Sequence, residues 1–148
     1  MSSKREQALS GLFLCLKEEL PKAVLGVEVL RNEVLPSKIP QGGVVIVRDG
    51  EAGEPEITLS PTCYHYQHHA EVEVLVQQAE QLKRDQVLDT LLQRVGQTLT
   101  LNLSLGGAVD YLHIGTPEFL SETTEGAPTI KAAVVPIILE YSTISPLS

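Results

Sequence analysis

The sequence is short of two kinds of residue, and each shortage argues against a class of protein. Its 148 residues include two cysteines, Cys15 and Cys63, which are too few for a disulfide framework and are expected to be free thiols in a reducing compartment. Lysine and arginine number 11 against 19 aspartates and glutamates, which gives a formal net charge of -8. Because cations that neutralise phosphates supply most of the affinity for DNA or RNA, a dedicated nucleic-acid binder is disfavoured.

Long apolar runs are missing as well. The apolar stretch near the N-terminus is interrupted at Lys17, Glu18 and Glu19, before it reaches the roughly 20 residues that span a bilayer. No small-residue cleavage site follows it. We therefore expect no membrane association, no secretory signal and a cytoplasmic location when the protein is made.

What remains is the composition of an ordinary folded domain. Hydrophobic residues make up 43% of the chain, which is enough to form a normal core. The length is typical of one domain, and we expect that domain to span residues 1–148.

The stretch from Tyr64 to Gln77 alternates strictly between apolar and polar residues. In a β-strand, successive side chains point to opposite faces. One face would therefore carry Tyr64, Tyr66, His68, Ala70, Val72, Val74 and Val76. The other would carry Cys63, His65, Gln67, His69, Glu71, Glu73 and Leu75. This pattern predicts a long antiparallel strand with one face on a core and the other in water.

Two segments show helical periodicity instead. The first runs from about Ser3 to Leu20, where Pro21 should end it. The second runs from Asp85 to between Thr98 and Asn102.

Shorter segments complete the pattern of elements. Further strands are predicted at Val24–Arg31, Val44–Val47, Ile57–Leu59, Ala108–Ile114 and Thr129–Tyr141. Val44–Val47 is apolar at every position, as in a central strand covered on both faces. Pro136 should require an edge or a bulge. A turn is predicted at Arg48–Pro55 and a long irregular connection at Gly115–Pro128.

The order of helix, strands, helix and strands contains no βαβ repeat. It predicts an α+β fold, with a single antiparallel sheet and both amphipathic helices packed on one face; a mixed sheet is the alternative.

The residues of the alternating stretch suggest two kinds of chemistry. His65, His69 and Glu71 share a face and are the candidate metal ligands, but His65 and His69 lie about 13 Å apart along a strand. One zinc ion cannot join them without residues from another strand, so polar residues on a wet face are the favoured interpretation. A thiol enzyme would use Cys63 with His65 as its base, and no nucleophile-elbow sequence accompanies them. We expect no cofactor.

Several segments, taken together and in order, resemble a small family encoded in tail-assembly clusters of long-tailed phages, prophages and gene transfer agents. They are Leu30–Pro36, Gly43–Gly50, Gly53–Glu56, Leu59–Pro61, Tyr64–Tyr66, Leu105–Gly107 and Ala132–Pro136. The family is that of the tail terminators, also called tail completion or minor tail proteins.

The resemblance implies a structural protein without enzymatic activity. Its subunits would form a homo-oligomeric ring, a hexamer, on the head-proximal end of the tail tube, stopping tube polymerisation and contacting the head connector. DNA would pass through the ring without specific binding, first in the host bacterial cytoplasm during assembly and then in the virion tail. Some relatives carry an acyl-CoA transferase label, which no residues here support.

Alternatives to this function are another head-tail joining protein, a tail tube protein, or a thiol or metal-dependent enzyme. The predicted partner contacts lie in the Arg48–Pro55 turn and the Gly115–Pro128 connection. They are Arg48, Asp49, Glu51, Glu54, Glu118, Phe119, Glu122 and Glu125.

Overall fold

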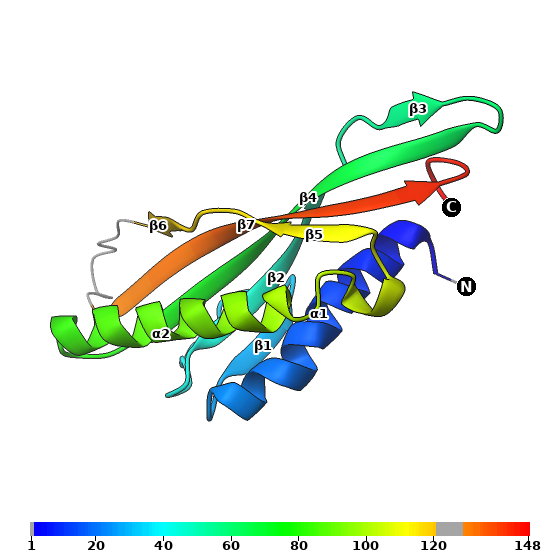
Figure 1. The fold of residues 1–148 in the computed structure, drawn as a ribbon. Coiled ribbons are helices and arrows are strands. Elements are labelled where there is room, and N and C mark those ends of the chain that lie inside the picture. The colour runs from blue at the N-terminus through cyan, green and yellow to red at the C-terminus, as the bar shows by residue number, and fades with distance from the viewer. Residues whose placement is uncertain (1, 121–128) are drawn as a thin grey trace.

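The computed structural model of the chain describes residues 2–120 and 129–148. In this part of the chain, two α-helices accompany a seven-stranded mixed sheet (Figure 1). The helices are α1 (Lys4–Ala23) and α2 (Gln81–Thr100), followed by a short 3₁₀ turn, η1 (Leu105–Gly107). The strands are β1 (Glu28–Arg31), β2 (Val44–Glu51), β3 (Glu56–Thr58), β4 (Cys63–Gln77), β5 (Tyr111–Ile114), β6 (Glu118–Leu120) and β7 (Ile130–Thr143).

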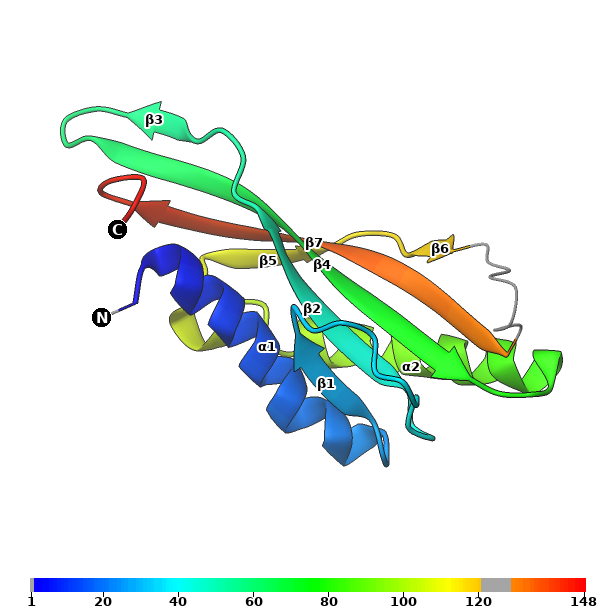
Figure 2. The same cartoon turned by 180° about the vertical axis from the view of Figure 1, so that it is seen from behind.

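The sheet runs in the order β1-β2-β4-β7-β5, with β3 beside β4 and β6 beside β7. The α+β class is confirmed, but a purely antiparallel sheet was the wrong expectation, because β1 pairs with β2 in parallel. Parallel neighbours need a crossover of about a dozen residues or more. The connection over residues 32–43 supplies it, as Figure 2 shows from behind. This connection is rich in proline and polar residues, and its sequence does not indicate whether β2 runs parallel or antiparallel to β1.

β4 is the long strand predicted from the alternation, and it lies between β2 and β7. Its residues Tyr66, His68, Ala70, Val72, Val74 and Val76 are buried toward the helices. The other side, which we call the open face, is formed by the alternate residues. In β4 these are His65, Gln67, His69, Glu71, Glu73 and Leu75.

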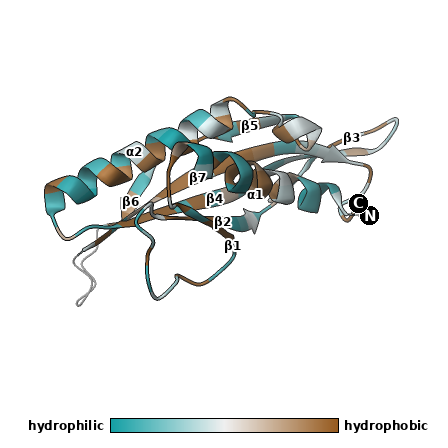
Figure 3. Ribbon diagram, turned by 90° about the horizontal axis from the view of Figure 1, so that it is seen from below, coloured by the Kyte–Doolittle hydropathy of each residue, from teal (hydrophilic) through white to brown (hydrophobic). Residues whose placement is uncertain are grey.

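The main core joins this helix-facing side of the sheet to α1 and α2. Leu12 and Leu16 of α1 and Leu88, Leu91 and Leu99 of α2 are almost fully buried against it. Figure 3 shows the hydrophobic residues gathered along β4 and β7, with hydrophilic residues on the outer turns of α2. Neither helix of the described residues is long and apolar enough to cross a membrane.

A second, smaller cluster covers one end of the open face. Ile39, from the connection over residues 32–43, packs with Val44, Ile46, Leu75 and Ala132. Val44–Val47 are consequently fully buried on both sides, as the unbroken apolar run predicted. The rest of the open face has no covering layer among the described residues.

Helix α1 begins as predicted and ends later. The Ser3 hydroxyl accepts a hydrogen bond from the Glu6 N–H at 3.1 Å, as an N-cap does. Pro21 does not stop the helix, which continues to Ala23. Proline in the last turn removes one backbone donor, and the turn still closes through the bond from the Val24 N–H to the Leu20 carbonyl at 2.9 Å.

Pro136 lies inside β7, opposite Glu71 of β4, so β7 is not an edge strand at this point and no bulge occurs. The Pro136 carbonyl accepts from the Gly115 N–H at 2.8 Å, on the side away from β4. Since N–H and C=O of one antiparallel residue point the same way, the missing proline donor faces that side too. There β5 has ended at Ile114 and β6 has not begun, so no ladder bond is lost.

Half of the predicted turn at Arg48–Pro55 is strand, since β2 runs to Glu51, and residues 52–55 form the connection to β3. The register between β2 and β4 shifts between Arg48 and Glu51, and Gly50 lies in this irregularity with φ of 64°. A Cβ atom at Gly50 would lie 1.9 Å from the His69 carbonyl oxygen. The charged residues thus continue the strand through a β-bulge. The polarity of this sequence predicted a turn, because polarity alone does not distinguish a turn from a bulged strand.

Candidate interaction surfaces

One end of the sheet is a narrow ribbon, and its β3–β4 hairpin projects past the helices (Figures 1 and 2). We call it the distal arm: β3, the Cys63–Tyr66 end of β4 and the Tyr141–Thr143 end of β7. β3 pairs with β4 along one side, and no described strand pairs with its other side. Ile57 in β3 is 53% exposed and Leu59, just beyond it, is 76% exposed. The arm therefore combines a free strand edge with exposed apolar side chains.

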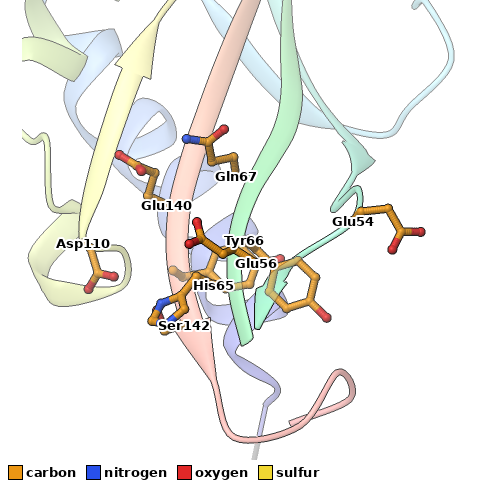
Figure 4. A pocket seen from close by; sticks show the side chains of 9 residues that line it. Glu54, Glu56, His65, Tyr66, Gln67, Asp110, Glu140 and Ser142 are labelled. Carbon is orange, nitrogen blue, oxygen red and sulfur yellow. The ribbon is translucent and has the colours of Figure 1, made fainter. Parts of the chain in front are cut away.

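A cleft of about 310 Å³ lies on the open face at the base of the arm (Figure 4). Four carboxylates line it: Glu54, Glu56, Asp110 and Glu140. Asp110 and Glu140 lie on one side of His65 and Glu54 on the other. The hydrogen bond from His113 lowers the pKa of the Glu140 carboxyl.

His65 lies in the cleft with both ring nitrogens engaged. Its Nδ1 is 2.7 Å from the Ser142 Oγ, and its Nε2 is 2.9 Å from the Thr58 Oγ1. The imidazole therefore ties β3 to β7 across β4. Cys63 shares this face two positions away and pairs with Thr58 in the ladder, but the histidine bonds the two hydroxyls. The Cys63–His65 pair expected of a thiol enzyme is not formed.

The candidate metal ligands share the open face, as predicted, but the structure does not gather them. His69 lies opposite Glu51 and Ile138, and Glu71 opposite Arg48 and Pro136. Across residues 2–120 and 129–148, no group of three His, Cys, Asp or Glu side chains is placed to hold a metal ion.

The predicted partner contacts in the first region divide into two groups. Arg48 bonds the Glu73 carboxylate at 3.3 Å, and Asp49 bonds Arg31 at 2.9 Å, so both charges already have internal partners. Glu51 and Glu54 are exposed. These two remain the contact candidates that the fold leaves free to meet another molecule.

The second region contributes Glu118 and Phe119, both exposed in β6. Phe119 is 53% exposed, and the Lys131 Nζ lies 5.3 Å from its ring centroid. Glu122 and Glu125 lie outside the described residues.

Arg31 forms a clamp that the sequence did not reveal. Its guanidinium donates two hydrogen bonds to Glu6 of α1, at 2.7 and 2.9 Å, and two to Asp49 of β2, at 2.9 and 3.1 Å. The Arg31 hydrogen bonds lower the pKa of the Glu6 carboxyl. Burial would raise the pKa of the Asp49 carboxyl, but hydrogen bonds from Arg31 and Asn32 lower it on balance. The spacing of 25 residues between Glu6 and Arg31 gave no clue to this pairing.

A buried network lies beside the clamp. His68 is 1% exposed, and burial lowers its pKa, which favours the neutral ring. Since a carbonyl only accepts, the His68 Nε2–H donates to the Asp49 carbonyl at 2.6 Å, and Nδ1 accepts from the Tyr141 hydroxyl at 2.9 Å. Burial raises the pKa of Tyr141 to about 12. His68 is thus a satisfied core residue that fixes the bulge of β2.

The open face is strongly acidic. The described strand positions on it include seven glutamates, namely Glu28, Glu51, Glu56, Glu71, Glu73, Glu118 and Glu140. Arg48 is the one lysine or arginine at those positions. Such a face repels phosphates.

Comparison with known proteins adds no family. No family model matches the chain, and no curated protein matches it.

Proposed function

We propose that this chain is a structural tail terminator, whose subunits form a six-fold ring on the head-proximal end of a phage-type tail tube. The ring stops tube polymerisation and presents a surface to the head connector. The distal arm carries the proposal, because a free strand edge with exposed Ile57 and Leu59 is a liability in a monomer. A neighbouring subunit would cover it.

The resemblance to tail terminators supports the proposal through residues that set the backbone. Gly43 has φ of 90°, and a Cβ atom there would lie 2.9 Å from the Leu75 carbonyl oxygen. Gly50 permits the bulge of β2, and Pro136 lies in the gap between β5 and β6. The motifs thus coincide with points where this fold requires particular residues, which is expected of a shared architecture.

The charge distribution agrees with a channel through which DNA slides. A ring that bound phosphates would retain the DNA, whereas seven glutamates against one arginine on the open face weaken any such contact. The net charge of -8 acts in the same direction.

We infer no bond-making role for the cleft. The Ser142–His65 contact has the spacing of a nucleophile and base, but Thr58 holds the other ring nitrogen where an orienting carboxylate would act. A hydroxyl at that position stabilises an imidazolium poorly.

The decisive experiment adds the purified chain to growing tail tubes. We expect density at one end of each tube in negatively stained electron micrographs, and a tube length that stops increasing. Incorporation along the tube would instead identify a tube subunit, and attachment to the connector alone another joining protein. Tubes that keep growing with bare ends would refute the proposal.

A further inference from the structure

A second surface, at the opposite end of the molecule from the arm, has the properties that the arm needs. A groove of about 470 Å³ lies between the turn after α1 and the N-terminal half of α2. Its apolar lining comes from Val24, Leu25, Val87 and Leu91, and Lys83 lies at its border. Leu25 is 94% exposed. This side chain therefore does nothing for the core of its own subunit.

Among the described residues that line the groove, Lys83 alone is charged, and Glu80 is the N-cap residue of the adjoining end of α2. The first turn of α2 contains no acidic residue, and the Glu80 side chain makes no capping hydrogen bond. Lys83 lies there instead, although the positive end of a helix favours anions. Asp85, further along, is already paired with Lys131 at 2.9 Å. An acidic partner would bring a charge of opposite sign to Lys83 in the lining of the groove.

The distal arm has the complementary chemistry. Glu54 and Glu56, which line the cleft of the open face, precede Ile57 and Leu59 in the chain, and all four are exposed. A methyl or methylene group occupies a volume similar to that of a water molecule in the liquid, which is roughly 30 Å³. The eight side-chain carbons of Ile57 and Leu59 would therefore fit into the groove with space for the polar rim.

We propose that the distal arm of one subunit docks into this groove of a second copy, with Ile57 and Leu59 among the apolar residues and Glu54 and Glu56 near Lys83. The inference rests on the proposed function, since it names the contact that builds the ring. The 15 residues of β4 separate the two surfaces by about 50 Å, so a subunit does not fill its own groove (Figure 1). Such a head-to-tail contact closes into a ring when the rotation between copies allows it.

Two complementary variants test this contact. The arm variant carries Ile57→Asp and Leu59→Asp, and the groove variant carries Leu25→Asp and Lys83→Glu. Each should associate with itself at least tenfold more weakly than the wild type in sedimentation velocity. Mixed together, they should form one-to-one pairs and nothing larger, because each retains the surface that the other has lost. Leu101→Asp is the control, since Leu101 is 84% exposed and lies at the other end of α2.

Circular dichroism and thermal unfolding of every variant confirm that it is folded. Rings that persist in the arm variant overturn the docking. A groove variant that still dimerises alone also overturns it, because that result indicates arm-to-arm pairing.

A cross-linking measurement tests the docking in the case where rings form only on tail tubes. With Leu59→p-benzoylphenylalanine in the chain at tube ends, irradiation should join position 59 to residues 24–26 or 83–91 of a neighbouring copy. Cross-links to the tube protein, or to other parts of the chain, overturn the docking while the capping function stands. A chain that never caps tubes fails the proposed function itself, a separate result.

Discussion

The two faces of the sheet share every strand but differ in what covers them. Toward the helices, Val72 and Val74 of β4 are fully buried. On the open face, the alternating Glu71 is exposed and Glu73 is half-buried beside Arg48. Because the pleat separates neighbours in the chain, one strand contributes to a core and to an acidic surface at once.

This difference separates stability from assembly. The helix-facing side holds nearly all of the main core, whereas the open face has a small apolar cluster at one end. Substitutions on the first face should therefore change the free energy of unfolding, and those on the second should change mainly charge and contacts.

The largest contrast is expected between two neighbouring isoleucines of β7. Ile137 is fully buried toward the helices, and Ile138 is half-buried on the open face. Ile137→Ala should lower the free energy of unfolding by about 2–5 kcal/mol, because it leaves a cavity. Ile138→Ala should lower it by about 1 kcal/mol, since less area returns to water. Urea unfolding measures both, and equal losses would show that the open face is covered.

A second contrast compares two glycines with positive φ near the bulge of β2. Gly50→Ala should lower the free energy of unfolding by about 3 kcal/mol, because backbone strain adds to the collision of the new Cβ with the His69 carbonyl oxygen. Gly53 has φ of 72° but no atom within 4 Å of its Cβ position. Gly53→Ala should therefore cost about 1 kcal/mol. Similar thermal-unfolding shifts for the two variants would contradict the close approach at Gly50.

Local sequence patterns predicted which helices and strands form better than they predicted which elements lie next to one another. The alternation of β4, the apolar run of β2 and the periodicity of both helices are set by burial, which leaves a period in the sequence. The parallel direction of β1 and the clamp at Arg31 depend on contacts between distant residues. Such contacts leave no local pattern, because neither partner marks the other in the sequence.

The same limit applies to the candidate surfaces. Glu51, Glu54, Glu118 and Phe119, which were predicted as partner contacts, lie at exposed positions, as polar and turn-rich segments usually do. Arg48 and Asp49 resembled them in sequence but bond internal partners. The groove beside Leu25 was missed, because its walls come from segments about 60 residues apart.

The clamp at Arg31 provides a third test, because here charged side chains join α1 to the sheet on its helix-facing side. Arg31→Ala should lower the free energy of unfolding by about 1 kcal/mol, since Glu6 and Asp49 lose a shared partner. The lowered pKa of both carboxyls means that their contribution is complete above the unfolded pKa of about 4. It is lost as pH falls through the lower folded pKa values.

Stability of the wild type should thus fall more steeply than that of Arg31→Ala on acidification below pH ~4. Urea unfolding at a series of pH values measures this. Parallel profiles for the two proteins would mean that the clamp does not hold Glu6 and Asp49 in their charged forms.

The smallest effect is expected between two glutamates of the open face itself. Glu73 lies 3.3 Å from Arg48, with both side chains about one-third exposed, whereas Glu71 points into solvent. Glu73→Gln should lower the free energy of unfolding by about 0.5 kcal/mol, in a salt-dependent way. Glu71→Gln should leave it unchanged, because the carboxylate has no bonded partner among the described residues, and its attraction to Arg48 on the opposite strand is offset by repulsion from its acidic neighbours. A large loss at Glu71 in urea unfolding would mean that the isolated subunit already uses its open face for stability, and that the division between the two faces fails.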